Sequence, residues 1–229
     1  MSTTSKRAYT YKLNLIAANI FSIVIFVLIM AFTFMIVGEI SFVGDNFALF
    51  MVIMFLYLIL HEILHGIGYI IGGTKIKNTK YGICLEKGFL YAMVMQEINK
   101  KNILISLQMP FMVIGVITYV IGIIFHLDLL VVLSIVNLMG ASMDLMMFLY
   151  ILKLPKDVTY SESGKNDEFV LISKEDLSKK KSMFFKVVSV KEYKKEDYVF
   201  KNFKRFEISK FSIVFFLILL LDYIVMTLL

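Results

Sequence analysis

The chain has 229 residues, of which 59% are hydrophobic and 18% are charged, and its formal net charge is +6 at neutral pH. Soluble proteins average about 45–50% apolar and 25% charged residues, so this composition excludes a soluble globular enzyme and intrinsic disorder. The single cysteine, Cys84, excludes an internal disulfide framework, and a polytopic membrane protein remains.

Five apolar stretches approach or exceed the roughly 20 residues that a helix needs to cross a bilayer. They comprise residues 13–37, 47–71, 103–125, 129–152 and 211–229. These stretches are continuous, without the period-2 alternation of barrel strands, and we interpret the first as a retained signal anchor. The sequence therefore predicts an all-α integral membrane protein with about five transmembrane helices.

The second stretch contains His61, Glu62 and His65 in an HExxH motif. The i, i+4 spacing places both imidazoles on one helix face, where they can share a metal ion. Glu62 projects close enough to accept a proton from the attacking water, as the glutamate of this motif does in zinc hydrolases. Since ionisable residues inside a membrane are costly, the motif indicates a Zn²⁺ site.

A β-hairpin is predicted between the second and third stretches. Residues 81–85 and 89–95 are rich in β-branched, aromatic and long apolar residues, and Gly88 lies in the turn between them. The hairpin can offer a strand edge to an extended substrate, since strand addition reads mainly the backbone. An ordinary re-entrant or interfacial loop is the alternative.

Two histidines leave a zinc site short of one protein ligand. Helix rise places Asp144, in the fourth stretch, level with the histidines, and Asp222, in the fifth, slightly deeper. Asn137 lies on the same small, polar helix face as Asp144 and is a candidate supporting group. The sequence therefore favours Asp144 as the third ligand, with Asp222, Glu86 and Glu97 as alternatives.

Residues 153–210 hold 15 basic and 10 acidic residues and form the sizeable aqueous segment of the chain. A short strand is predicted at residues 167–173, and no nucleic-acid-binding motif accompanies the charge. We therefore predict three parts: a membrane metallopeptidase-like core over residues 1–152, a basic cytosolic segment over 153–210 and a C-terminal transmembrane helix over 211–229.

The basic residues also predict the orientation. All 24 Lys and Arg residues lie before the first stretch, between Lys75 and Lys101, or between Lys153 and Lys210. With five spans these segments share one face, which the positive-inside rule makes cytoplasmic. We expect a multi-pass protein of the cell membrane, in contact with the lipid bilayer, with its N-terminus inside and its C-terminus outside.

The chain resembles a known family over roughly residues 50–160. The strings HEILHGIGY, YGICLEKGFLYAMVMQEINKKNILISLQMPF and NLMGASMDLMMFLYILKLPKDV look like the bacterial putative zincin peptidase family, which is similar to site-2-type intramembrane zinc metalloproteases. The resemblance implies that His61, His65 and Asp144 are zinc ligands, that Glu62 is the catalytic base and that Asn137 supports the site.

Two functions follow from these features. The first is a zinc-dependent intramembrane metalloprotease that hydrolyses peptide bonds of a membrane-protein or peptide substrate. The alternative is a non-hydrolytic membrane protein that binds metal for structure, sensing or transport. The sequence names neither the substrate nor an oligomeric state.

Overall fold

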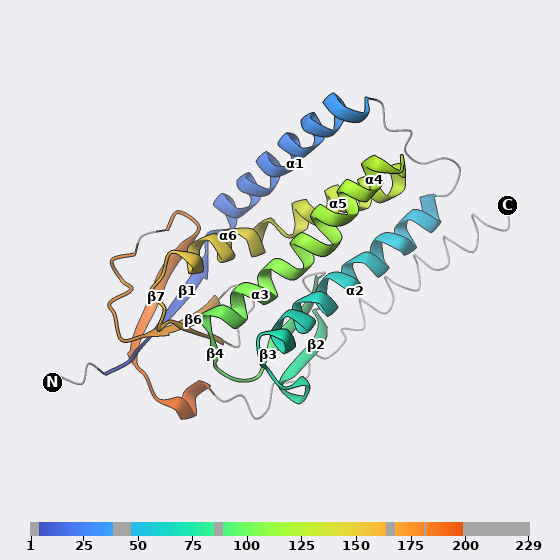
Figure 1. Cartoon of the computed structure of the whole chain (residues 1–229). Coiled ribbons are helices and arrows are strands. Elements are labelled where there is room, and N and C mark those ends of the chain that lie inside the picture. The colour runs from blue at the N-terminus through green and yellow to red at the C-terminus, as the bar shows by residue number, and fades with distance from the viewer. Residues whose placement is uncertain (1–4, 39–46, 85–88, 164–167, 181, 199–229) are drawn as a thin grey trace.

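The structure is a computed structural model, and it describes residues 5–38, 47–84, 89–163, 168–180 and 182–198 (Figure 1). The helices are α1 (Leu15–Val37), α2 (Phe47–Ile71), α3 (Lys100–Pro110), α4 (Thr118–Ile124), α5 (Asp128–Gly140) and α6 (Ser142–Leu152). A π-helix, η2 (Phe111–Ile117), joins α3 to α4, and two short 3₁₀ turns are η1 (Ile76–Asn78) and η3 (Lys195–Tyr198). The strands are β1 (Arg7–Leu13), β2 (Thr79–Cys84), β3 (Phe89–Val94), β4 (Ile98–Asn99), β5 (Thr159–Glu162), β6 (Glu168–Ser173) and β7 (Phe185–Glu192).

Four of the five predicted apolar stretches form helices. Within the described ranges, three helices are long and apolar enough to cross a membrane: residues 15–37, 49–71 and 100–124, the last comprising α3, η2 and α4. The fourth stretch is broken, because α5 and α6 meet at an angle of 49°, and it adds a fourth span if the pair is counted as one. The predicted fifth helix, at 211–229, lies outside the described residues.

The prediction of an all-α protein is wrong, because two antiparallel sheets accompany the helices and the fold is mixed α and β. The predicted hairpin is present as β2 paired with β3, and the predicted strand near 167–173 is β6. The larger sheet was missed. Its strands are short and partly charged, so they lie outside the apolar stretches from which the fold class was inferred.

The larger sheet has the strand order β4-β5-β6-β1-β7, with every neighbouring pair antiparallel. One of its inner strands, β1, precedes the first helix, yet Tyr9 pairs with Leu171 on one side and Val190 on the other. Tyr9, Tyr11 and Leu171 are fully buried in the main core, which continues into α3 and α6. The sheet therefore joins both sides of the boundary predicted after residue 152.

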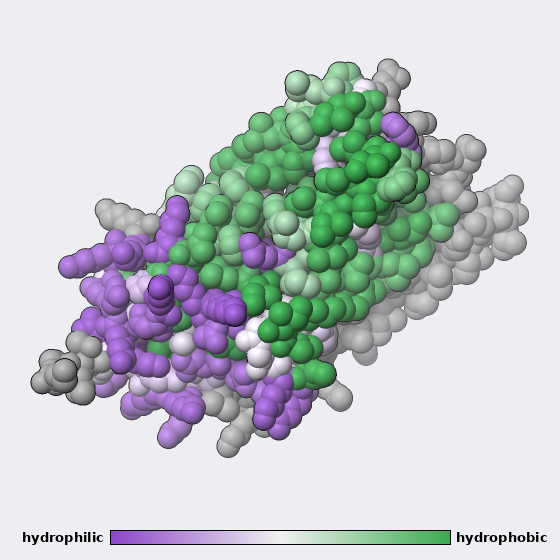
Figure 2. Space-filling view, in the orientation of Figure 1, coloured by the Kyte–Doolittle hydropathy of each residue, from purple (hydrophilic) through white to green (hydrophobic). Residues whose placement is uncertain are grey.

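Polar and apolar surfaces separate along the molecule. Hydrophilic residues gather at the end that carries the five-stranded sheet, whereas hydrophobic residues cover the helices (Figure 2). Large apolar side chains of α1 are well exposed, Ile16 by 74% and Met35 by 83%. An apolar exterior of this extent is expected of helices that contact lipid.

Glycines allow α2 to approach α3 closely. A Cβ atom added to Gly68 would lie 2.5 Å from Cα of Ser106, and one added to Gly72 would lie 2.8 Å from Cα of Asn102. Small residues at i, i+4 are typical of close contacts between membrane helices. The two helices therefore pack backbone against backbone beside the second histidine of the motif.

We predict that Gly68→Ala separates α2 from α3 and lowers the melting temperature of the purified protein. The added methyl group meets backbone atoms, which cannot rotate aside, and overpacking of this kind costs about 1–3 kcal/mol. Gly140→Ala is the matched control, because an added Cβ there has no neighbour within 4 Å. Equal melting temperatures for the two variants would contradict the prediction.

Candidate metal centre

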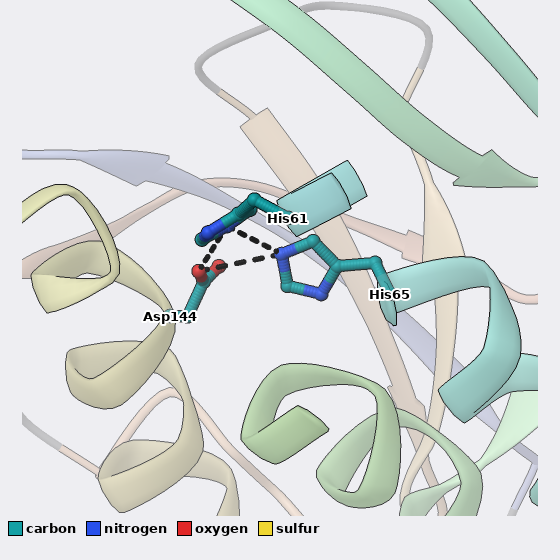
Figure 3. Close-up of side chains that lie close together, drawn as sticks. All are labelled: His61, His65 and Asp144. Carbon is teal, nitrogen blue, oxygen red and sulfur yellow. Dashed lines mark hydrogen bonds and ion pairs between the residues drawn. The ribbon is translucent and has the colours of Figure 1, made fainter. Parts of the chain in front are cut away.

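The site lies where α2 meets the first turn of α6. The motif places His61 and His65 one turn apart on α2, and Asp144 follows the break between α5 and α6. The Nε2 atoms of the histidines lie 3.1 Å apart, and each lies 3.3 Å from Oδ2 of Asp144. Figure 3 shows the two rings and the carboxylate converging on one point, so the cluster could hold a metal ion.

These separations fit a tetrahedral ion. Ligand atoms about 2.0–2.1 Å from a tetrahedral zinc lie ~3.3 Å from one another, close to the three distances in the cluster. Two imidazole nitrogens and one carboxylate oxygen are also donors that zinc prefers. The residues present therefore fit the metal that the HExxH motif indicates.

Hydrogen bonds to the far sides of both rings determine which nitrogens face the site. Nδ1 of His61 donates to Oδ1 of Asn137 at 2.8 Å, and Nδ1 of His65 donates to the carbonyl oxygen of Ser106 at 3.0 Å. Both partners can only accept, so each neutral ring carries its hydrogen on Nδ1 and presents a lone pair from Nε2. Lone pairs that face a carboxylate need a cation or a proton between them.

The carbonyl of Ser106 is available because of Pro110. In an α-helix this carbonyl would accept from the N–H four residues later, but proline has no N–H. His65 occupies the unused acceptor, and Oγ of Ser106 donates back to the carbonyl oxygen of His65 at 2.9 Å. A proline inside a helix thus orients a histidine of the neighbouring helix.

Asn137 connects three elements at the site. Its Oδ1 accepts from His61 on α2, and its Nδ2 donates to the carbonyl oxygen of Pro110 at 3.2 Å. Asn137 itself lies in the last turns of α5, just before the break that precedes Asp144. The broken span therefore supplies both the carboxylate and the amide from one irregular stretch.

Glu62 lies between the cluster and the hairpin. Its carboxyl group is in hydrogen-bonding reach of the backbone of Ala92 in β3. The backbone N–H of Met95 donates to the carbonyl oxygen of Asn78, on the β2 side of β3. Backbone N–H groups alternate in direction along a strand, and Ala92 is three residues before Met95, so the N–H of Ala92 points away from β2. Glu62 therefore faces the edge of β3 that no described strand covers.

The structure brings together the site residues that the sequence favoured. His61, His65, Asp144 and Asn137 form one hydrogen-bonded cluster with Glu62 beside it, whereas the roles assigned to them stay predictions. Sequence reasoning missed the serine whose carbonyl orients the second histidine. Its signal was a proline four residues later within an apolar stretch.

The remaining carboxylates considered as third ligands do not join the cluster within the described part of the chain. Glu97 bonds instead to Thr159 and Tyr193. Glu86 and Asp222 lie outside the described residues. Asp144 is therefore the carboxylate that the structure places against the two histidines.

Comparison with known proteins gives a family match over the segment that contains the cluster. Residues 53–159 match the family described as "Putative zincin peptidase". The match contains the HExxH motif, Asn137 and Asp144, and it confirms the family resemblance seen in the sequence. No curated protein and no solved structure matches the chain, and the similarity to site-2 proteases stays a prediction.

We predict that Asn137→Ala weakens zinc affinity by about 10–100-fold, because the ring of His61 loses the acceptor that fixes its orientation. Competition of the purified protein with a zinc chelator measures this change. Ser134→Ala, one turn earlier on α5, is the control, since its hydroxyl bonds to Thr118 and to the carbonyl of Leu130. Unchanged affinity in Asn137→Ala would contradict a supporting role.

Proposed function

We propose that this chain is a zinc-dependent intramembrane metalloprotease that hydrolyses peptide bonds of membrane-associated substrates. The observation that carries the proposal is the convergence of the lone pairs of His61 and His65 on the carboxylate of Asp144, with Glu62 beside them. A family match to zincin-type peptidases supports the same chemistry.

In this proposal the residues of the site have three different roles: metal binding, proton transfer and orientation of the imidazole rings. His61, His65 and Asp144 would hold Zn²⁺, which when bound supplies Lewis-acid chemistry for water and the scissile carbonyl. Glu62 accepts the proton of the attacking water and passes it to the leaving amine. Asn137 and Ser106 keep the imidazoles aligned.

An open coordination position favours catalysis over a purely structural metal. Structural zinc sites are closed by four protein ligands, whereas catalytic sites use three and leave one position for water or substrate. Among the described residues, the cluster has three members: His61, His65 and Asp144. The non-hydrolytic alternative would need a further ligand and would have no use for a base at Glu62.

The edge of β3 is the proposed place for the substrate backbone. Ala92 and Val94 direct their N–H groups away from β2, and Glu62 lies at the first of these positions. An extended peptide can pair with such an edge through its backbone, with little demand on its sequence. A transmembrane substrate would have to unwind locally to pair in this way.

We predict that Glu62→Gln abolishes hydrolysis and retains zinc, because the amide keeps the shape of the side chain but accepts no proton. Loss of a general base reduces the rate by about 10²–10⁴-fold. Co-expression with a panel of single-span membrane proteins, followed by immunoblotting, measures cleavage, and elemental analysis of the purified protein measures zinc.

Asp144→Asn is the matched control, because it should lose zinc as well as activity, a neutral amide being a poorer zinc ligand than a carboxylate. If a substrate were cleaved unchanged by the Glu62→Gln protein, the protease mechanism would be wrong. Zinc binding without cleavage of any substrate by the wild-type protein would favour the non-hydrolytic alternative.

The same proposal assigns an orientation, with the five-stranded sheet and the N-terminus in the cytoplasm and the C-terminus outside. Its support is the basic composition of the segments that form the sheet, together with the positive-inside rule.

We expect a single cysteine introduced as Lys191→Cys, in a Cys84→Ala background, to react with an impermeant thiol reagent in inverted vesicles and not in intact cells. Lys191 is exposed at the end of β7, so the label needs no unfolding. Labelling in intact cells would reverse the assigned orientation.

A further inference from the structure

A second carboxyl group faces the edge of β3. Glu162, the last residue of β5, is in hydrogen-bonding reach of the backbone of Val94 and of the Tyr160 side chain. Val94 is fully buried, so its outward N–H requires an acceptor, and the Glu162 carboxylate lies within reach of it. Two acids, Glu62 and Glu162, therefore lie beside successive outward N–H groups of one strand.

The spacing of these acids corresponds to a short length of substrate. Ala92 and Val94 are two residues apart, or ~7 Å along an extended strand. A peptide paired with this edge beside Glu62 would reach Glu162 within two or three residues. Tyr69, in the last turns of α2, also lies near Glu162, so the second acid is on the sheet side of the metal cluster.

Glu162 is partly buried, and its charged form has therefore lost part of its contact with water. Removal from water raises the pKa of Glu162 to about 7, even though hydrogen bonds from Tyr160 and Val94 favour the charged form. In the part of the chain that the structure describes, no Lys or Arg forms an ion pair with this carboxylate. A partly buried carboxylate in this position would be stabilised by a cation from outside the chain.

We propose that Glu162 is a specificity-determining residue that pairs with a Lys or Arg side chain of the substrate, two or three residues from the scissile bond on the sheet side. The inference rests on the proposed function, because it uses the β3 edge as the substrate site. When the substrate strand pairs with β3, the Glu162 carboxylate moves away from the backbone N–H of Val94. The positive charge of the substrate Lys or Arg then balances the negative charge of the carboxylate.

The chemistry of membrane proteins agrees with such a preference. Transmembrane segments carry an excess of Lys and Arg next to their cytoplasmic ends. With the sheet in the cytoplasm, a substrate helix that unwinds onto β3 brings these residues toward Glu162. An apolar pocket at this position would instead disfavour substrates that carry Lys or Arg next to the cytoplasmic end of their transmembrane segment.

Binding to the non-hydrolysing Glu62→Gln protein tests the inference. The probes are synthetic fluorescent peptides in detergent micelles, each with an apolar segment of about 20 residues and a Gly/Ser flank that carries one Lys or, in the matched peptide, one Gln, scanned along the flank. We expect the Lys peptide to bind about 10-fold or more tightly than its Gln partner at a restricted set of positions. Added Glu162→Gln should abolish that preference.

Glu192→Gln is the control variant, since Glu192 is an exposed carboxylate at the far end of β7 and should leave the preference intact. A general loss of structure would weaken both peptides equally and would show in the melting temperature, whereas the inference requires the Lys-to-Gln ratio to change alone. A ratio near one in the Glu62→Gln protein, or a ratio that survives Glu162→Gln, overturns it.

Failure of the proposed function gives a different result. If the wild-type protein cleaves a substrate while Glu162→Gln leaves its Lys-to-Gln preference unchanged, the protease assignment stands and the role of Glu162 falls. If the wild-type protein cleaves nothing but binding shows the Glu162-dependent preference, the peptide site stands without hydrolysis.

Discussion

The close contact between α2 and α3 is the constraint on which the site depends. Gly68 removes the side chain that would hold the helices apart, and Ser106 lies directly against it. At that distance the carbonyl left unpaired by Pro110 is within reach of His65. Both residues, Ser106 and His65, are buried, so water cannot bond to the free carbonyl or to the free imidazole N–H, and the two groups bond to each other instead. A motif on one helix is thus oriented by an interruption in the next.

A second irregular stretch of backbone, the break between α5 and α6, also positions side chains of the site. The break between α5 and α6 places Asn137 before it and Asp144 after it, and both side chains turn toward α2. An unbroken helix would carry these residues along one straight face. The 49° bend instead directs two polar groups to one buried point while the outer surface of the span stays apolar.

Much of the site could be predicted from local sequence, and much of the fold could not. The i, i+4 spacing of His61 and His65 and the depth of Asp144 depend only on helix geometry, and the hairpin on strand and turn composition. The five-stranded sheet depends on pairing between distant residues such as Arg7 and Ser173, for which a single sequence holds no local signal. Glu162 belongs to that class, since its place beside β3 is visible only once β5 is in the sheet.

The position of β1 governs the order in which the protein can be completed. This strand is synthesised before α1, yet both of its partners, β6 and β7, follow α6. Its tyrosines have no core to pack against until the intervening helices and the later strands have been synthesised. Loop closure over so long a separation is slow, so sheet assembly should be the late step of folding. The finished sheet then connects the segment before α1 to the segment after α6, and the backbone N–H of Tyr193 donates to the carbonyl oxygen of Lys6.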